Sequence, residues 1–203
     1  MDRSRLEAFS DGVFAVAITL LALNLTVAGP GHGPLAKQLG EHWPAFAGYL
    51  ISFLTIGIIW VNHHVLVRSI TTVDRTLLFL NLMLLLFVVL IPFGTATAAD
   101  YLPHNTWDAR LAMVLYAGIF LGMSAGFGAI FEWTLHGPRT QQPLPAEQHW
   151  AARRRFLGGG AVYAVAMVVA LASALAAFVL IGLVAMYYIL ERTPSSAADG
   201  DIE

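Results

Sequence analysis

Long apolar blocks constrain this chain more than any other feature of its sequence. They cover residues 6–27, 44–67, 76–98, 110–135 and 156–190. A helix needs about 20 residues to cross a hydrocarbon core, and in lipid a spanning segment must satisfy its backbone groups internally. With 58% hydrophobic and only 12% charged residues, the chain is predicted to be an all-α, polytopic membrane protein.

The last block is too long for one span. Its 35 residues would extend about 52 Å as a single helix, which no ordinary tilt fits into a bilayer. We therefore expect two spans with a turn near 172–174, which makes six transmembrane helices in all. Five spans remain an alternative, because no glycine or proline marks that turn.

Cationic residues orient the six spans. With the N-terminus in the cytoplasm, nine of the 11 lysines and arginines fall on the cytoplasmic side and only Lys37 and Arg110 lie outside, as the positive-inside rule requires. The C-terminus is then cytoplasmic too. With five spans only Arg192 would change sides, so the charges orient the N-terminus more firmly than the C-terminus.

A single domain is expected. Residues 1–192 would form one six-helix transmembrane domain, because the connections at 28–43, 99–108 and 136–151 are too short to hold a soluble domain. The acidic, polar tail at 193–203 is expected to be disordered. The absence of cysteine excludes disulfides and thiolate sites.

Asp11 is the most informative polar residue, because it lies inside the first apolar block. A carboxylate at membrane depth costs at least about 2.5 kcal/mol and marks a functional site by default. The spacing of Ser4 and Glu7 fits a capping box and predicts a helix that begins at Ser4. In the alternative interpretation, Asp11 lies in the headgroup zone and pairs with an arginine such as Arg5.

Polar residues of the second and third blocks share the depth of Ser10 and Asp11. They are Trp60, Asn62, His63, His64, Asp74, Arg75 and Asn81. Because buried polar groups in lipid need partners within the protein, we expect a network that joins the first three spans. His63 and His64 point about 100° apart on a helix, so they cannot readily hold one metal ion, and we expect neither a metal nor a cofactor.

An apolar stripe follows on the first helix. Val16, Leu20 and Leu23 have i, i+4, i+7 spacing, and Thr19 lies one turn from both Val16 and Leu23. Ala17 is expected to face lipid. From spacing alone, packing or lipid contact is the ordinary interpretation of such a stripe, and a pore-lining role needs a further argument.

Resemblance to a known family supplies that argument. Arg5, Phe9, Ser10 and Asp11 form an R-x-x-x-F-S-D pattern continued by GVFAVAITLLALNL, and Trp60 begins a W-x-x-H-H stretch. The chain resembles the transmembrane protein 175 family of potassium channels, most closely over residues 5–25. The resemblance implies a moderately potassium-selective channel in the bacterial inner membrane, with no re-entrant filter loop, whose pore is lined by the first helices of a homotetramer.

Site residues also follow from this resemblance. It implies that Val16, Leu20 and Leu23 form apolar rings that gate by dewetting, that Thr19 forms a hydroxyl layer, and that potassium is the permeant ion. The expected structural network comprises Arg5, Phe9, Ser10, Asp11, Trp60, His63, His64 and Asn81.

Two other function classes fit the sequence less well. A proton-coupled secondary transporter would use Asp11 with His63 or His64 as a proton relay, but these residues lie near the end of their spans, and no paired Gly/Pro-broken helices are evident. An enzyme is not expected, because the sequence holds no histidine–glutamate metal motif and no serine–histidine arrangement at membrane depth. Nucleic acid is not an expected partner.

Overall fold

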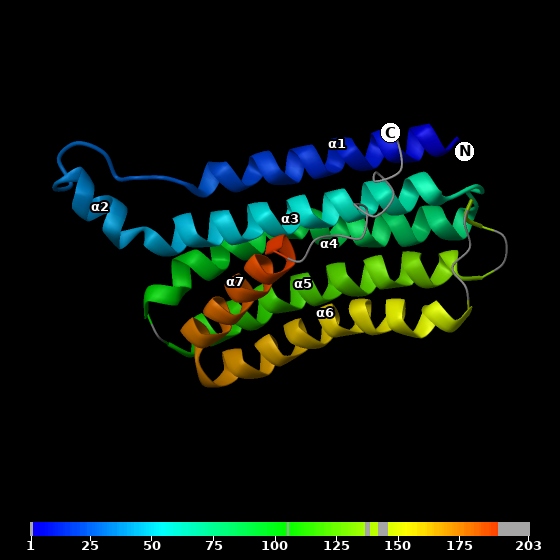
Figure 1. The fold of residues 1–203 in the computed structure, drawn as a ribbon. Coiled ribbons are helices and arrows are strands. Elements are labelled where there is room, and N and C mark those ends of the chain that lie inside the picture. Colours follow the sequence, from blue (N-terminus) through cyan, green and yellow to red (C-terminus); the bar gives the residue numbers. More distant parts are fainter. Residues whose placement is uncertain (1, 105, 137–138, 142–145, 191–203) are drawn as a thin grey trace, which may run out of the picture.

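The computed structural model describes residues 2–104, 106–136, 139–141 and 146–190, and its regular elements are helices (Figure 1). They are α1 (Arg3–Leu21), the 3₁₀ turn η1 (Ala22–Asn24), α2 (Leu35–Glu41), α3 (Trp43–Ser69), α4 (Arg75–Tyr101), the 3₁₀ turn η2 (Leu102–His104), α5 (Trp107–Thr134), α6 (Ala146–Ala172) and α7 (Ala174–Leu190). The predicted all-α, multi-pass class is confirmed.

Four of these helical segments are long and apolar enough to cross a membrane by length and composition. They are Arg3–Asn24, Trp43–Ser69, Arg75–His104 and Trp107–Thr134. The fifth apolar block supplies two shorter apolar helices, Gly158–Ala172 and Ala174–Ile189. The chain breaks between them at Ser173, where the length argument places the turn.

Ser173 makes this break without a glycine or proline. Its hydroxyl oxygen accepts a hydrogen bond from the backbone N–H of Ala176 at 3.2 Å, the kind of bond that starts a new helix. From there α7 folds back along α6 (Figure 1).

One local prediction, the capping box at the start of the first helix, is wrong. Helix α1 begins at Arg3 rather than Ser4, its N-cap is Asp2, and no side chain caps it; Glu7 pairs instead with a residue of α3, described below. The connection at 28–43 contains the short helix α2, which follows a turn with three glycines at positive φ, namely Gly29, Gly31 and Gly33. The tail at 193–203, which is predicted to be disordered, lies outside the described residues.

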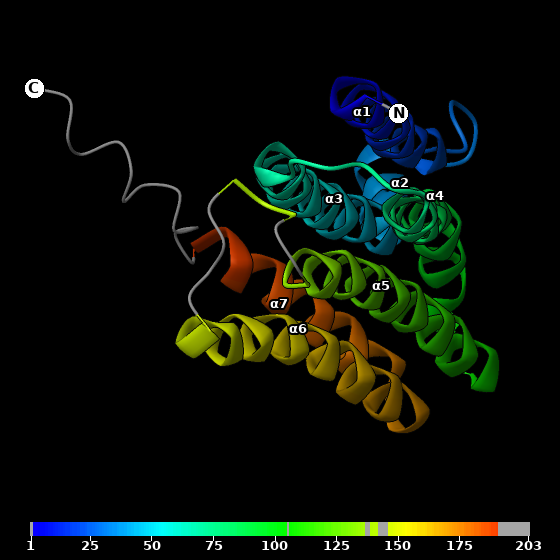
Figure 2. The same cartoon turned by 90° about the vertical axis from the view of Figure 1, so that its right-hand side faces the viewer.

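Helix α1 lies at the outer edge of the bundle, packed against α3 and α4 (Figure 2). The interior is formed mainly by α4 and α5, whose backbones approach closely: a Cβ built on Gly126 of α5 would lie 3.0 Å from the Leu84 Cα of α4. Ser52 of α3 also lies 2.7 Å from the hydroxyls of both Thr95 and Tyr116, a buried hydroxyl cluster that joins three helices.

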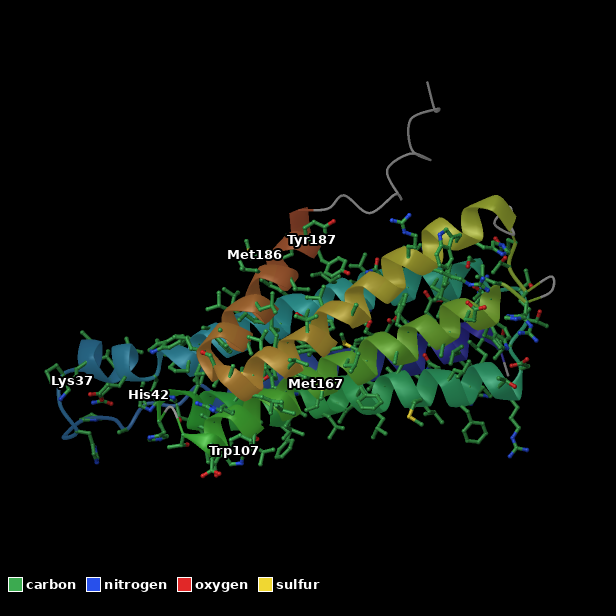
Figure 3. The ribbon with its side chains drawn as sticks, turned by 90° about the horizontal axis from the view of Figure 1, so that it is seen from below. Lys37, His42, Trp107, Met167, Met186 and Tyr187 are labelled. Carbon is green, nitrogen blue, oxygen red and sulfur yellow. The ribbon has the colours of Figure 1, made fainter. Side chains whose placement is uncertain are left out.

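One end of the bundle gathers the head of α1, the α3–α4 connection and the described residues 139–141 between α5 and α6 (Figure 1). The last two connections pair through a β-bridge between Ile70 and Thr140. Lys37, His42 and Trp107 lie at the opposite end (Figure 3). The connections between successive helices thus alternate between the two ends of the bundle. The positive-inside argument assumes this arrangement for the first five predicted spans.

Candidate functional site on the first helix

A buried chain of three polar side chains joins α1, α3 and α4. Asn81 of α4 donates from Nδ2 to Ser10 Oγ at 3.0 Å, and its Oδ1 accepts from Nε2 of His63 at 2.7 Å. Ser10 donates in turn to the carbonyl of Leu6 at 2.9 Å. Ser10, His63 and Asn81 are each no more than 1% exposed, and such a satisfied polar chain in a core specifies how its helices meet.

A second set of contacts forms a ladder between α1 and α3. The indole N–H of Trp60 donates to Asp11 Oδ1 at 2.8 Å, and His64 Nδ1 lies 2.9 Å from Glu7 Oε1. One turn further, Arg3 donates to the carbonyl of Arg68 at 2.9 Å. The rungs step by four residues along each helix, in opposite directions, because the two helices are antiparallel (Figure 1).

Arg5 and Phe9 do not join these contacts. Both are exposed on α1, and within the described chain no hydrogen bond or ion pair links Arg5 to Asp11. The alternative interpretation, in which Asp11 pairs with an arginine such as Arg5, does not hold in this structure: the hydrogen-bond partner of Asp11 is the neutral Trp60 indole.

The predicted pore stripe lies on the side of α1 that faces away from α3 and α4. Val16 is 55%, Leu20 37% and Leu23 71% exposed, and Thr19 is exposed as well. Ala17 is completely buried, so the expectation that it faces lipid is wrong. One residue along a helix turns by about 100°, which carries position 17 from the bare face into the contact with the bundle.

Thr19 keeps its hydroxyl close to its own helix. Oγ1 donates to the carbonyl of Val16 at 2.8 Å, a common bond for threonine in membrane helices. This bond uses the hydroxyl proton and leaves the oxygen lone pairs available to a cation.

Sequence reasoning missed Arg3, Glu7 and Arg68 as site residues. Arg3, Glu7 and Asp11 have i, i+4, i+8 spacing, as do Trp60, His64 and Arg68. Two polar stripes of equal period at the same predicted depth are a signal that could have found the ladder. The capping-box interpretation of Glu7 concealed it.

The fold and site together define a multi-pass helical membrane protein whose first helix is held by polar contacts on one side and is bare on the other. Comparison with known proteins agrees. A curated relative from Streptomyces collinus, named a potassium channel, is 39% identical over 200 residues, covering 95% of this chain and 94% of the relative. The crystal structure of a lysosomal potassium-selective channel TMEM175 homolog from Chamaesiphon minutus has a TM-score of 0.80 at 33% identity, covering 93% and 96% of the two chains.

A family model described as endosomal/lysosomal potassium channel TMEM175 matches residues 5–92. The chain belongs to the TMEM175 family, as its first helix and the Trp60–His64 stretch predict. Animal relatives are longer: the human endosomal/lysosomal proton channel TMEM175 is 31% identical over 155 residues, which cover 70% of this chain but only 30% of the human protein.

Proposed function

We propose that this chain is a potassium channel whose pore is lined by the bare faces of α1 helices from several copies. The observation that carries the proposal is the exposed stripe of Val16, Thr19, Leu20 and Leu23 on a helix held firmly from its opposite side. A stripe that the described part of its own chain leaves exposed is available to line a shared pore. The names of the bacterial relatives support potassium as the permeant ion.

The stripe supplies two kinds of ring. Val16, Leu20 and Leu23 offer an ion nothing to replace its hydration shell, so narrow rings of these side chains expel water and close the pore, and a small widening restores conduction. Thr19 places hydroxyl oxygens between them. Weak neutral ligands favour the cation that is cheaper to dehydrate, so potassium is preferred over sodium, moderately.

The membrane arrangement belongs to the same proposal. Helices α1, α3, α4, α5, α6 and α7 are the six spans, both termini are cytoplasmic, and the protein lies in the bacterial inner membrane as a homotetramer. One signature helix per chain requires several copies around a central axis. The buried Ser10–Asn81–His63 chain holds each α1 in the orientation that turns its stripe toward the axis. No enzymatic role is proposed.

Potassium efflux from proteoliposomes, with sodium as the competing cation, tests the proposal. We expect flux that favours potassium, together with discrete current steps in single-channel recordings. Slow, saturable flux without steps would contradict it and favour the transporter alternative that uses Asp11 with His63 or His64.

A further inference from the structure

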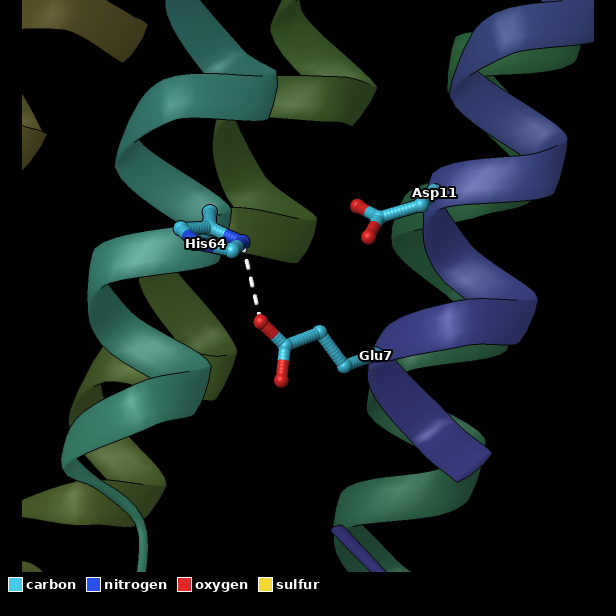
Figure 4. Close-up of side chains that lie close together, drawn as sticks. All are labelled: Glu7, Asp11 and His64. Atoms are coloured by element: carbon cyan, nitrogen blue, oxygen red, sulfur yellow. Dashed lines mark ion pairs between the residues drawn. The ribbon is translucent and has the colours of Figure 1, made fainter. Parts of the chain in front are cut away.

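Glu7, Asp11 and His64 direct donor atoms toward a common point between α1 and α3. One ligand atom from each lies within 4.8 Å of the other two, and all three residues are half-buried. Figure 4 shows the two carboxylates reaching from α1 toward the His64 ring on α3. One imidazole nitrogen with two carboxylate oxygens is a donor set that suits divalent transition-metal cations.

The contact between His64 and Glu7 is close but does not have the geometry of a hydrogen bond. Nδ1 of His64 lies 2.9 Å from Glu7 Oε1, yet it is shielded from solvent and has no hydrogen-bond partner within the described residues. A neutral ring without a proton on Nδ1 turns a lone pair toward the carboxylate, and the two repel. In this tautomer, a cation bound by both atoms removes the repulsion.

We propose that Glu7, Asp11 and His64 bind a divalent transition-metal cation of the Zn²⁺ type, with water completing its coordination. Around a tetrahedral ion with bonds of about 2.0 Å, neighbouring ligand atoms lie about 3.3 Å apart. The donor atoms of the cluster therefore need to close by no more than about 1.5 Å, within the reach of side-chain rotation. Two carboxylates and a neutral imidazole balance the charge of the ion.

The groups around Glu7, Asp11 and His64 are compatible with a bound metal ion. The Trp60 N–H holds Asp11 at 2.8 Å, the kind of outer contact that orients a metal ligand. Arg68 Nε lies 3.7 Å from Glu7 Oε1 on a side chain that is 68% exposed, so it can move away when the ion neutralises the carboxylate. A cavity of about 410 Å³, lined in part by Arg3, Ser4 and Glu7, adjoins the Glu7 side of the cluster.

Zn²⁺ titration of the untagged, chelator-treated protein in detergent tests the proposal, with binding followed by calorimetry. We expect one Zn²⁺ per chain and a higher melting temperature with the ion, because it joins α1 to α3 in the folded state only. Excess Mg²⁺ should not displace it, since the imidazole nitrogen favours the softer ion.

Glu7→Gln and His64→Gln each remove one ligand, and each should weaken Zn²⁺ binding at least about tenfold and abolish the thermal shift. The matched control is the double variant Glu41→Gln/His42→Gln, which removes the same two residue types at the opposite end of α3. It should bind Zn²⁺ as the parent protein does.

Equal Zn²⁺ affinity in the parent and both single variants would overturn the proposal, as would an equal loss in the control. Should both variants fail to assemble, the Co²⁺ absorption spectrum of the parent protein decides. Intense visible bands of four-coordinate Co²⁺ support the site, whereas weak six-coordinate bands or no Co²⁺ binding overturn it.

Discussion

Thr19 and Val16 stand one turn apart on the bare face of α1 but offer an ion opposite surroundings. The Thr19 hydroxyl donates its proton to the carbonyl of Val16 in the same helix, and its oxygen keeps lone pairs for a cation. Val16 presents two methyl groups and is 55% exposed. Their functions in a shared pore can be separated by substitutions that change polarity and keep shape.

Thr19→Val keeps the branched shape and removes the oxygen. The permeability ratio of potassium to sodium should fall toward one, because the remaining side chains of the stripe carry no oxygen ligand. Reversal potentials under bi-ionic conditions measure this ratio. An unchanged ratio would mean that the Thr19 hydroxyl serves only its own helix.

Val16→Asn should raise basal cation flux, because the amide hydrates an apolar ring that would otherwise exclude water. Flux from proteoliposomes is the measurement. The control is Val168→Asn, the same change at a valine that is 68% exposed on α6, remote from α1 (Figure 1). A well-folded Val16→Asn protein with the same flux as the parent would contradict a pore-lining position for Val16.

Helix pairs are held in two ways in this fold. Between α1 and its neighbours, the packing of buried apolar side chains such as Leu6 and Phe14 is joined by polar contacts. These are the ladder to α3 and the buried hydrogen bonds of Asn81 with Ser10 and His63. Between α4 and α5, the two helix backbones lie close to each other at Gly126. Small residues at a helix interface permit such proximity in membranes.

Asn81→Leu should destabilise the contact of α1 with α3 and α4. Leucine keeps the branched shape but leaves Ser10 and His63 without the amide, at a cost of about 1–3 kcal/mol for buried polar groups. Thermal melts should show the loss. Asn62→Leu is the control, because Asn62 is half-buried and its side chain makes no hydrogen bond within the described residues.

Asp11→Asn tests the ladder between α1 and α3, and its effect on stability can be compared with that of Asn81→Leu. An asparagine oxygen still accepts from Trp60, so this change should cost much less stability than Asn81→Leu. A larger loss from Asp11→Asn would show that the charge of Asp11, rather than its acceptor oxygen, holds α1 to α3.

Gly126→Ala should lower the melting temperature, because the added Cβ would lie 3.0 Å from the Leu84 Cα and 3.2 Å from its backbone nitrogen. Backbone atoms cannot turn aside, and overpacking of this kind costs about 1–3 kcal/mol. Gly128→Ala is the control on the same helix, with nothing within 4 Å of its Cβ. There alanine should stabilise slightly, so two equal melts would contradict the close packing of α4 and α5.

Across the whole molecule, α1 occupies an outer edge of the bundle (Figure 2). A pore lined by α1 must therefore lie between copies rather than inside one chain. Native mass measurement in detergent should show a homotetramer, and a protein that conducts ions as a monomer would contradict the shared pore.

Properties that depend on residues along one helix were predictable from the sequence. The apolar block lengths indicated membrane helices, the length of the fifth block placed its break near Ser173, and the R-x-x-x-F-S-D pattern indicated the family. Depth along a helix rises evenly with residue number, so the sequence also placed Ser10, Asp11, His63 and Asn81 in one layer.

Rotation about each helix axis was decided only by the tertiary structure. Val16 and Ala17 are neighbours of similar polarity, yet one is bare and the other buried, because only packing against α3 and α4 selects the face. The partner of Asp11 depended in the same way on which α3 side chains the antiparallel contact brought near. Trp60, rather than Arg5, contacts Asp11, and His64 contacts Glu7. Such pairings depend on the relative rotation and offset of α1 and α3, which the sequence of one helix alone does not specify.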